Sequence, residues 1–215
     1  MLEQPPYLLT LLHYCEFFAT LIALLYYRQV QHTYWKWFAW YLAYISFYEL
    51  GSGLIFSYFH FDFPFYYAYG AIPIEFLFFM WLYAYKSLEN RKLFWICAAV
   101  YLLSFLFEES LSKGIFYFSS FNYIIGSLII LVLVCLEYYK QIKSDAILLF
   151  KSNKMFYINM GVVLFYLGTL PFFGLYYPML KEPSIWNKYY IYFMASNCVM
   201  YLLFAASFIW GKTKS

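Results

Sequence analysis

The sequence predicts an all-α membrane protein, a bundle of seven transmembrane helices that forms a single domain over residues 1–215. Composition is the first reason, because 65% of the residues are hydrophobic and only 12% are charged, whereas soluble domains carry roughly 25% charged residues. The second reason is size, since a soluble core in so short a chain cannot hide that much apolar surface. The third is that the apolar residues form continuous runs of about 20, which is the length that crosses the hydrocarbon core.

The apolar runs can be followed in chain order. The first lacks the basic segment and cleavage site of a signal peptide, so we expect it to be a retained helix. The aromatic segment HFDFPF precedes the third run, and a connection between lysines at 140 and 154 precedes the sixth. We expect that connection to lie among lipid headgroups. Each run is about twice as long as a barrel strand, which excludes a β-barrel. The predicted helices are residues 7–27, 35–58, 65–85, 93–111, 115–139, 155–177 and 189–210.

The basic residues of the connections predict the orientation. Cytoplasmic loops are enriched in Lys and Arg, and here the two sides differ sharply. One side holds Arg28, Lys36, Lys86, Arg91, Lys92, Lys140, Lys143, Lys151, Lys154, Lys212 and Lys214. The other side holds only Lys113, Lys181 and Lys188. We therefore expect the N-terminus outside and the C-terminus in the cytoplasm, in a multi-pass protein of the cell membrane, specifically a bacterial inner membrane.

Three carboxylates lie inside the predicted spans at similar depth. Glu16, Glu49 and Glu75 each stand about nine or ten residues from the outer end of their helix, which at 1.5 Å per residue places them near one level. An unpaired charge at that depth costs several kcal/mol. The three therefore predict a shared polar layer on the first three helices.

Other polar residues are predicted at the same level. His13 precedes Glu16 by three residues and Ser46 precedes Glu49 by three, so each pair shares a helix face. Asn197 lies at similar depth in the last helix. Two interpretations stay open. In one, these groups are hydrogen-bonded or protonated and only hold the helices in register. In the other, they form a pocket that binds a ligand, a proton or a cation.

A metal site is a separate hypothesis. His13 with the three glutamates offers one nitrogen and three carboxylates, a donor set suited to iron or manganese. Di-iron bundles, however, usually take paired Glu-x-x-His motifs from two helices, and this layer contains one histidine. We therefore predict no cofactor and leave the metal question open.

Seven helices with this orientation also occur in rhodopsins, which need a lysine in the middle of the last helix to bind retinal. The last run, YYIYFMASNCVMYLLFAASFIW, contains none, so retinal is excluded. The segment FYINMGVVLFYLGTLPFF at 156–173 resembles part of the small seven-helix membrane proteins and seven-helix sensor modules of bacteria. Such modules usually precede a kinase or cyclase domain. The resemblance implies a signalling role that depends on a separate partner chain.

Function is predicted only by class. The loops are too short for a catalytic domain, no nucleotide-binding or hydrolase motif occurs, and the basic residues are too scattered for a nucleic-acid partner. We expect a non-enzymatic sensor or binding module, or a subunit of a membrane complex, with lipid and another membrane protein as its partners. The alternatives are a small transporter or proton- or cation-handling protein, and an intramembrane enzyme with a carboxylate and His13 as acid and base.

Overall fold

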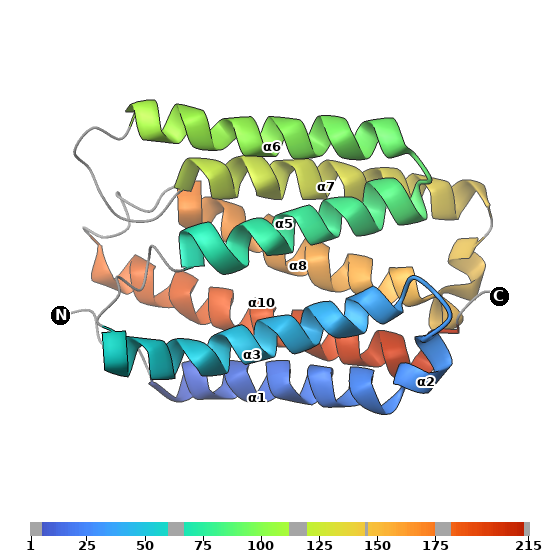
Figure 1. The fold of residues 1–215 in the computed structure, drawn as a ribbon, viewed down its shortest axis with the longest axis horizontal. Coiled ribbons are helices and arrows are strands. Elements are labelled where there is room, and N and C mark those ends of the chain that lie inside the picture. Colours follow the sequence, from blue (N-terminus) through green and yellow to red (C-terminus); the bar gives the residue numbers. More distant parts are fainter. Residues whose placement is uncertain (1–5, 60–66, 112–119, 145, 175–181, 213–215) are drawn as a thin grey trace. The chain divides into compact units, whose positions relative to one another are not determined.

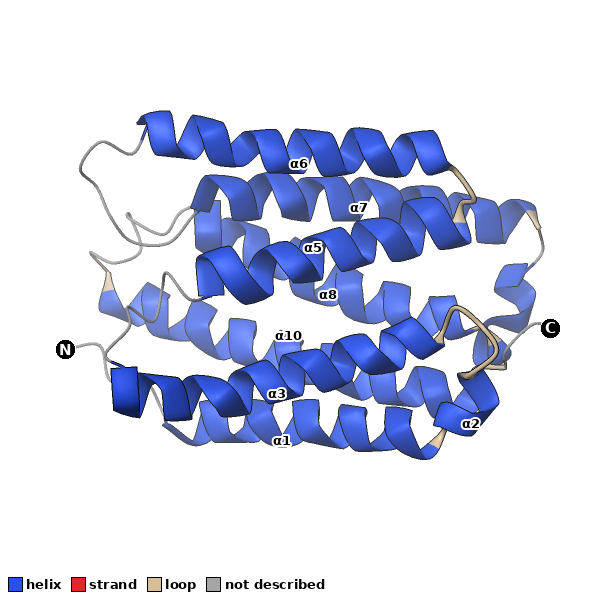
Figure 2. Cartoon of the chain, in the orientation of Figure 1, coloured by secondary structure: helices blue, strands red, loops and turns tan. Residues whose placement is uncertain are grey.

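The structure is a computed structural model that describes the chain except for residues 1–5, 60–66, 112–119, 145, 175–181 and 213–215 (Figure 1). The segment HFDFPF, together with Lys113, Lys181 and Lys214, lies outside the described residues. Within the described part the chain is helical almost throughout and contains no β-strand (Figure 2). A single bridge pairs Asn153 with Lys212. The prediction of an all-helical chain is confirmed.

The chain divides into two compact units, which we describe separately. Unit 1 comprises Met1–Glu49 and Gln141–Ser215, and unit 2 comprises Leu50–Lys140. Two helices continue from one unit into the other, α3 (Lys36–Phe59) and α7 (Ser120–Lys143).

Unit 1 is built around its last helix, α10 (Pro183–Trp210), which packs against α1 (Pro6–Leu25) and α8 (Lys154–Gly174). The short helices α2 (Tyr27–Val30) and η3 (Ala146–Ser152) complete it. Aromatic rings join α3 to α10, because the Phe38 ring lies 5.1 Å from that of Phe204 and 5.8 Å from that of Phe208. The core of this unit is therefore aromatic and centred on α10.

Unit 2 contains a continuous helical stretch formed by η1 (Tyr67–Ala71), α5 (Ile72–Met80) and η2 (Trp81–Ser87). The first and third parts are wide π-type turns. Pro73 follows the first of them, and because proline lacks an amide hydrogen and its ring crowds the preceding turn, a wider turn there relieves the clash.

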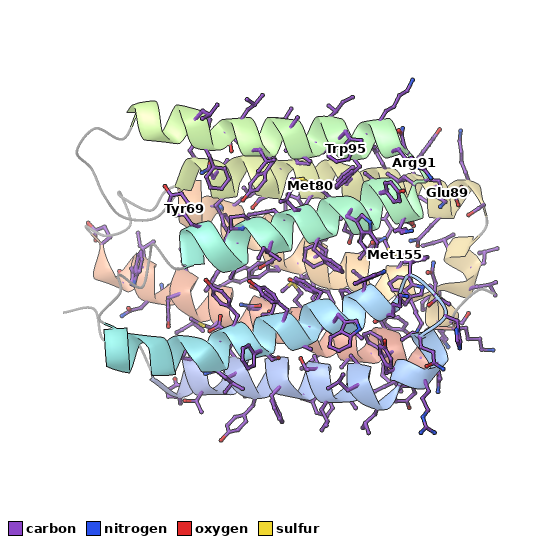
Figure 3. All side chains as sticks on the ribbon, in the orientation of Figure 1. Tyr69, Met80, Glu89, Arg91, Trp95 and Met155 are labelled. Atoms are coloured by element: carbon purple, nitrogen blue, oxygen red, sulfur yellow. The ribbon has the colours of Figure 1, made fainter. Side chains whose placement is uncertain are left out.

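Two further helices complete unit 2, α6 (Arg91–Leu111) and α7. Glu89 turns the chain from η2 into α6 with a positive φ of 56°, beside Arg91 (Figure 3). The Phe76 ring packs on Tyr101 of α6 and on Tyr123 of α7. Gly126 makes room for that ring, since a Cβ there would lie 2.7 Å from it.

Large apolar side chains cover much of the surface of α1. Phe17, Leu21 and Leu25 of α1 are exposed, whereas Glu16 and Thr20 of the same helix are buried. Soluble proteins rarely expose such large apolar areas. Three helices of the described chain are long and apolar enough to cross a membrane, over Tyr7–Leu25, Phe121–Lys143 and Ser184–Trp210.

Candidate functional site

A row of polar side chains lies where α1 meets α3 in unit 1. On α1, residues His13, Glu16 and Thr20 follow one another at a spacing that keeps them on one helix face. On α3, Ser46 and Glu49 do the same. We call these five residues the α1–α3 seam.

One end of the seam is fixed by hydroxyl groups. The Thr20 hydroxyl donates to the carbonyl oxygen of Leu42 at 3.0 Å and lies 2.7 Å from the Ser46 hydroxyl oxygen. The Ser46 hydroxyl also lies 3.4 Å from the backbone carbonyl of Glu16, so its single proton can go either to this carbonyl or to the Thr20 oxygen. Both hydroxyl side chains are buried. Because buried hydroxyls need partners, these contacts set the register between α1 and α3.

The other end of the seam pairs two titratable groups. Nε2 of His13 lies 3.6 Å from Oε2 of Glu49, with side chains that are 43% and 22% exposed. The pair attracts when the imidazole carries a proton. This end of the seam is more exposed than the Thr20–Ser46 end.

Glu16 lies between these two ends and is only 4% exposed. Its carboxylate acts electrostatically on Cys198 of α10, so the seam reaches a third helix. The residue beside that cysteine, Asn197, has a buried side-chain oxygen that accepts no hydrogen bond from any described residue. A carboxylate and an amide oxygen thus offer hydrogen-bond acceptors in the interior of unit 1.

The six residues that the sequence singled out divide between the units. His13, Glu16, Ser46, Glu49 and Asn197 belong to unit 1, and the contacts above connect the first four across α1 and α3. Glu75 belongs to unit 2, in the first turn of α5, where it is partly buried. The layer of three carboxylates therefore stays a prediction.

The metal hypothesis for His13, Glu16, Glu49 and Glu75 stays a prediction. Across the described ranges, no three His, Cys, Asp or Glu side chains come together closely enough to hold a metal ion.

Glu137 of α7 is buried. The Ser87 hydroxyl of η2 donates to its Oε2 at 2.6 Å, and Lys140 donates to the Ser87 carbonyl oxygen. Ser87 lies 50 residues away in the sequence, so no local pattern indicated this contact.

Lys154 is the residue that sequence reasoning missed most clearly. The sequence placed it at the end of a connection expected to lie among lipid headgroups, yet its side chain is only 4% exposed. Nζ donates to the carbonyl oxygen of Ser207 at 3.0 Å and lies 5.2 Å from the centre of the Phe208 ring. Burial lowers the pKa of Lys154 to about 8, because a charged ammonium loses its water there. Gly211, which leaves space for this side chain, was the only available signal.

Comparisons with protein-family models, with curated proteins and with solved structures found no match.

Proposed function

We propose that this chain is a multi-pass protein of the bacterial inner membrane that binds a small cationic, hydrogen-bond-donating ligand at the α1–α3 seam. It would act without catalysis, as a sensor or binding module within a larger membrane complex. The resemblance of residues 156–173 to bacterial seven-helix sensor modules supports this class of function.

Within the described part of the chain, three helices are long and apolar enough to cross a membrane. The lengths of four further helical stretches support a total of seven spans. Helices α3, α6 and α8 have 24, 21 and 21 residues. At 1.5 Å per residue, 21 residues extend roughly 30 Å, the thickness of the hydrocarbon core. The stretch Tyr67–Ser87 would be the remaining span, and the distribution of Lys and Arg supports an external N-terminus.

Glu16 is the observation that carries the binding proposal. A buried carboxylate within a membrane-crossing segment is expensive, and such residues usually mark ligand, ion or proton pathways. The amide oxygen of Asn197 and the carboxylate of Glu49 belong to the same unit and are further acceptors. A ligand with N–H donors and a positive charge would complement these oxygen atoms.

Thermal stability of the purified protein in lipid nanodiscs tests this proposal. Methylammonium is the probe, and tetramethylammonium is the matched control because it has the same charge and no N–H group. A ligand at about 100 times its Kd stabilises a protein by ~2.7 kcal/mol, so methylammonium should raise the Tm by several degrees. Glu16→Gln should abolish that rise, and Glu182→Gln, at an exposed position, should preserve it. An equal response to both cations would contradict the proposal.

A proton- or cation-handling protein is the second candidate. It is favoured by the His13–Glu49 pair, which would supply a titratable entrance to Glu16. It predicts a proton or sodium flux in proteoliposomes that Glu16→Gln removes without changing the Tm in the absence of probe.

The subunit role predicts a stoichiometric partner after extraction in mild detergent, and a clean monomer would count against it.

A further inference from the structure

Two cysteine thiols meet between α1 and α10. The side chains of Cys15 on α1 and Cys198 on α10 lie close enough to interact, and both cysteines are free thiols. They are 9% and 7% exposed, so this contact lies within the packed interior of unit 1. The other two cysteines, Cys97 and Cys135, belong to unit 2 and provide an internal comparison.

Small side chains explain how two helices approach closely enough for this contact. Cys15, Ala19 and Ala23 follow at four-residue spacing along one face of α1, and both alanines are fully buried. Small residues at this spacing let helix backbones pack closely in membranes. Helices α1 and α10 also run in the same direction (Figure 1). A disulfide requires the Cβ atoms of the two cysteines to come within about 3.5–4.5 Å, which the packing of α1 against α10 favours.

The surroundings of the pair restrict which oxidant can reach it. Both cysteines lie within segments apolar enough to span a membrane, and the outer face of α1 next to them, at Tyr14 and Phe18, is exposed and aromatic. A water-soluble oxidant is poorly soluble in that environment. A lipid-soluble quinone dissolves in the hydrocarbon core and can approach from the lipid side.

We propose that Cys15 and Cys198 form a reversible disulfide with a lipid-soluble quinone as the oxidant. Two S–H bonds break and one S–S bond forms, while the two electrons and two protons pass to the quinone and yield the quinol. The reverse reaction, with a dithiol as reductant, restores both thiols.

The disulfide would regulate the site described above, and in this respect the inference rests on the proposed function. Cys15 precedes Glu16 and Cys198 follows Asn197, so the bond would join the two helices directly beside the proposed ligand acceptors. Once linked, α1 and α10 can no longer shift against each other at that level. The oxidised protein would therefore bind methylammonium with a changed affinity, coupling the redox state of the membrane to the seam.

Counting thiols tests the disulfide. Purified protein in nanodiscs is treated with decylubiquinone, denatured, and labelled with a maleimide large enough to shift its electrophoretic mobility. Before oxidation all four cysteines should react, and after it only two. The variant with Cys97→Ser and Cys135→Ser should go from two labels to none, whereas Cys15→Ser and Cys198→Ser should each keep three. Cys→Ala versions replace any serine variant that does not fold.

Mass spectrometry then identifies the linked peptides. A bond between Cys15 and Cys198 that dithiothreitol reverses supports the proposal. Four reactive thiols after quinone treatment, or a bond that includes Cys97 or Cys135, overturns it. The methylammonium response of the reduced protein is measured separately. If the disulfide forms but methylammonium does not raise the Tm, only the proposed ligand is rejected. If methylammonium raises the Tm but no disulfide forms, only the redox site is rejected.

Discussion

The ammonium group of Lys154, at the start of α8, donates to the Ser207 carbonyl oxygen in the last turn of α10 at 3.0 Å. The helix dipole places partial negative charge on these last carbonyls. The contact therefore adds a charged donor from the beginning of one helix to a carbonyl that also accepts from the Gly211 amide at the end of another. Its drawback is a buried charge.

Stability should depend on the charge of Lys154. Its pKa is lowered to about 8 in the folded protein, compared with about 10.4 for an unfolded lysine. Between these values the unfolded chain binds more protons, so this lysine makes stability rise as pH increases from about 8 to about 10.4. Lys154→Met should remove that part of the pH dependence. Melting curves across this range check it, with exposed Lys151→Met as the control; equal slopes in wild type and Lys154→Met would reject the prediction.

A methyl group at Gly211 should disturb the same contact. A Cβ at this position would lie 2.3 Å from Cγ of Lys154 and 2.4 Å from the Ser207 carbonyl oxygen. Overpacking of this kind costs typically ~1–3 kcal/mol, so Gly211→Ala should lower the Tm. Gly51→Ala is the matched control, because a Cβ there meets nothing within 4 Å, and alanine favours a helix by about 0.5–1 kcal/mol over glycine. If Gly211→Ala leaves the Tm unchanged, the end of α10 can shift enough to accept the methyl group, and the prediction is wrong.

Removal of the Ser87 hydroxyl should destabilise unit 2. It donates to buried Glu137 at 2.6 Å, and hydrogen bonds to charged groups contribute roughly 1.5–3 kcal/mol. We expect Ser87→Ala to lower the Tm by several degrees and exposed Ser144→Ala to leave it nearly unchanged. If Ser87→Ala melts at the same temperature as wild type, the other interactions of Glu137 are sufficient to stabilise its buried carboxylate.

Topology is tested by labelling from each side of the membrane. Cysteines are introduced singly at Lys151 and Lys188, two exposed positions, in a chain whose four native cysteines are replaced by serine. An impermeant maleimide should label position 188 in intact cells and position 151 only in inverted vesicles. The opposite pattern would reverse the orientation, and labelling of both positions from one side would contradict a single span between positions 151 and 188.

Helix positions were largely predictable because a long apolar run indicates a helix of about the length that crosses the hydrocarbon core. The run at 35–58 corresponds to Lys36–Phe59. The last helix was predicted to start at 189 but begins at Pro183. The lysine and asparagine at 188 and 187 suggested a loop, whereas Pro is favourable in the first turn of a helix.

Long-range contacts were harder to predict than helices. Equal depth and shared helix faces indicated that His13, Glu16, Ser46 and Glu49 belong together, and α1 and α3 do connect them. The partners of Glu137 and Lys154 lie 50 and 53 residues away. Such contacts depend on which helices pack together, and the sequence pattern of one helix contains no information about that.

The length of α10 has a consequence for its fit to the bilayer. Its 28 residues extend roughly 42 Å at 1.5 Å per residue, about 12 Å more than a typical hydrocarbon core. The apolar part of α10 begins after Lys188, so the first turns of the helix can project past the lipid tails, and tilt accommodates the remaining excess length. Because α10 packs against both α1 and α8, any change in its tilt moves both neighbours. Bilayer thickness would then affect the tilt of the helix that holds Asn197 and Cys198.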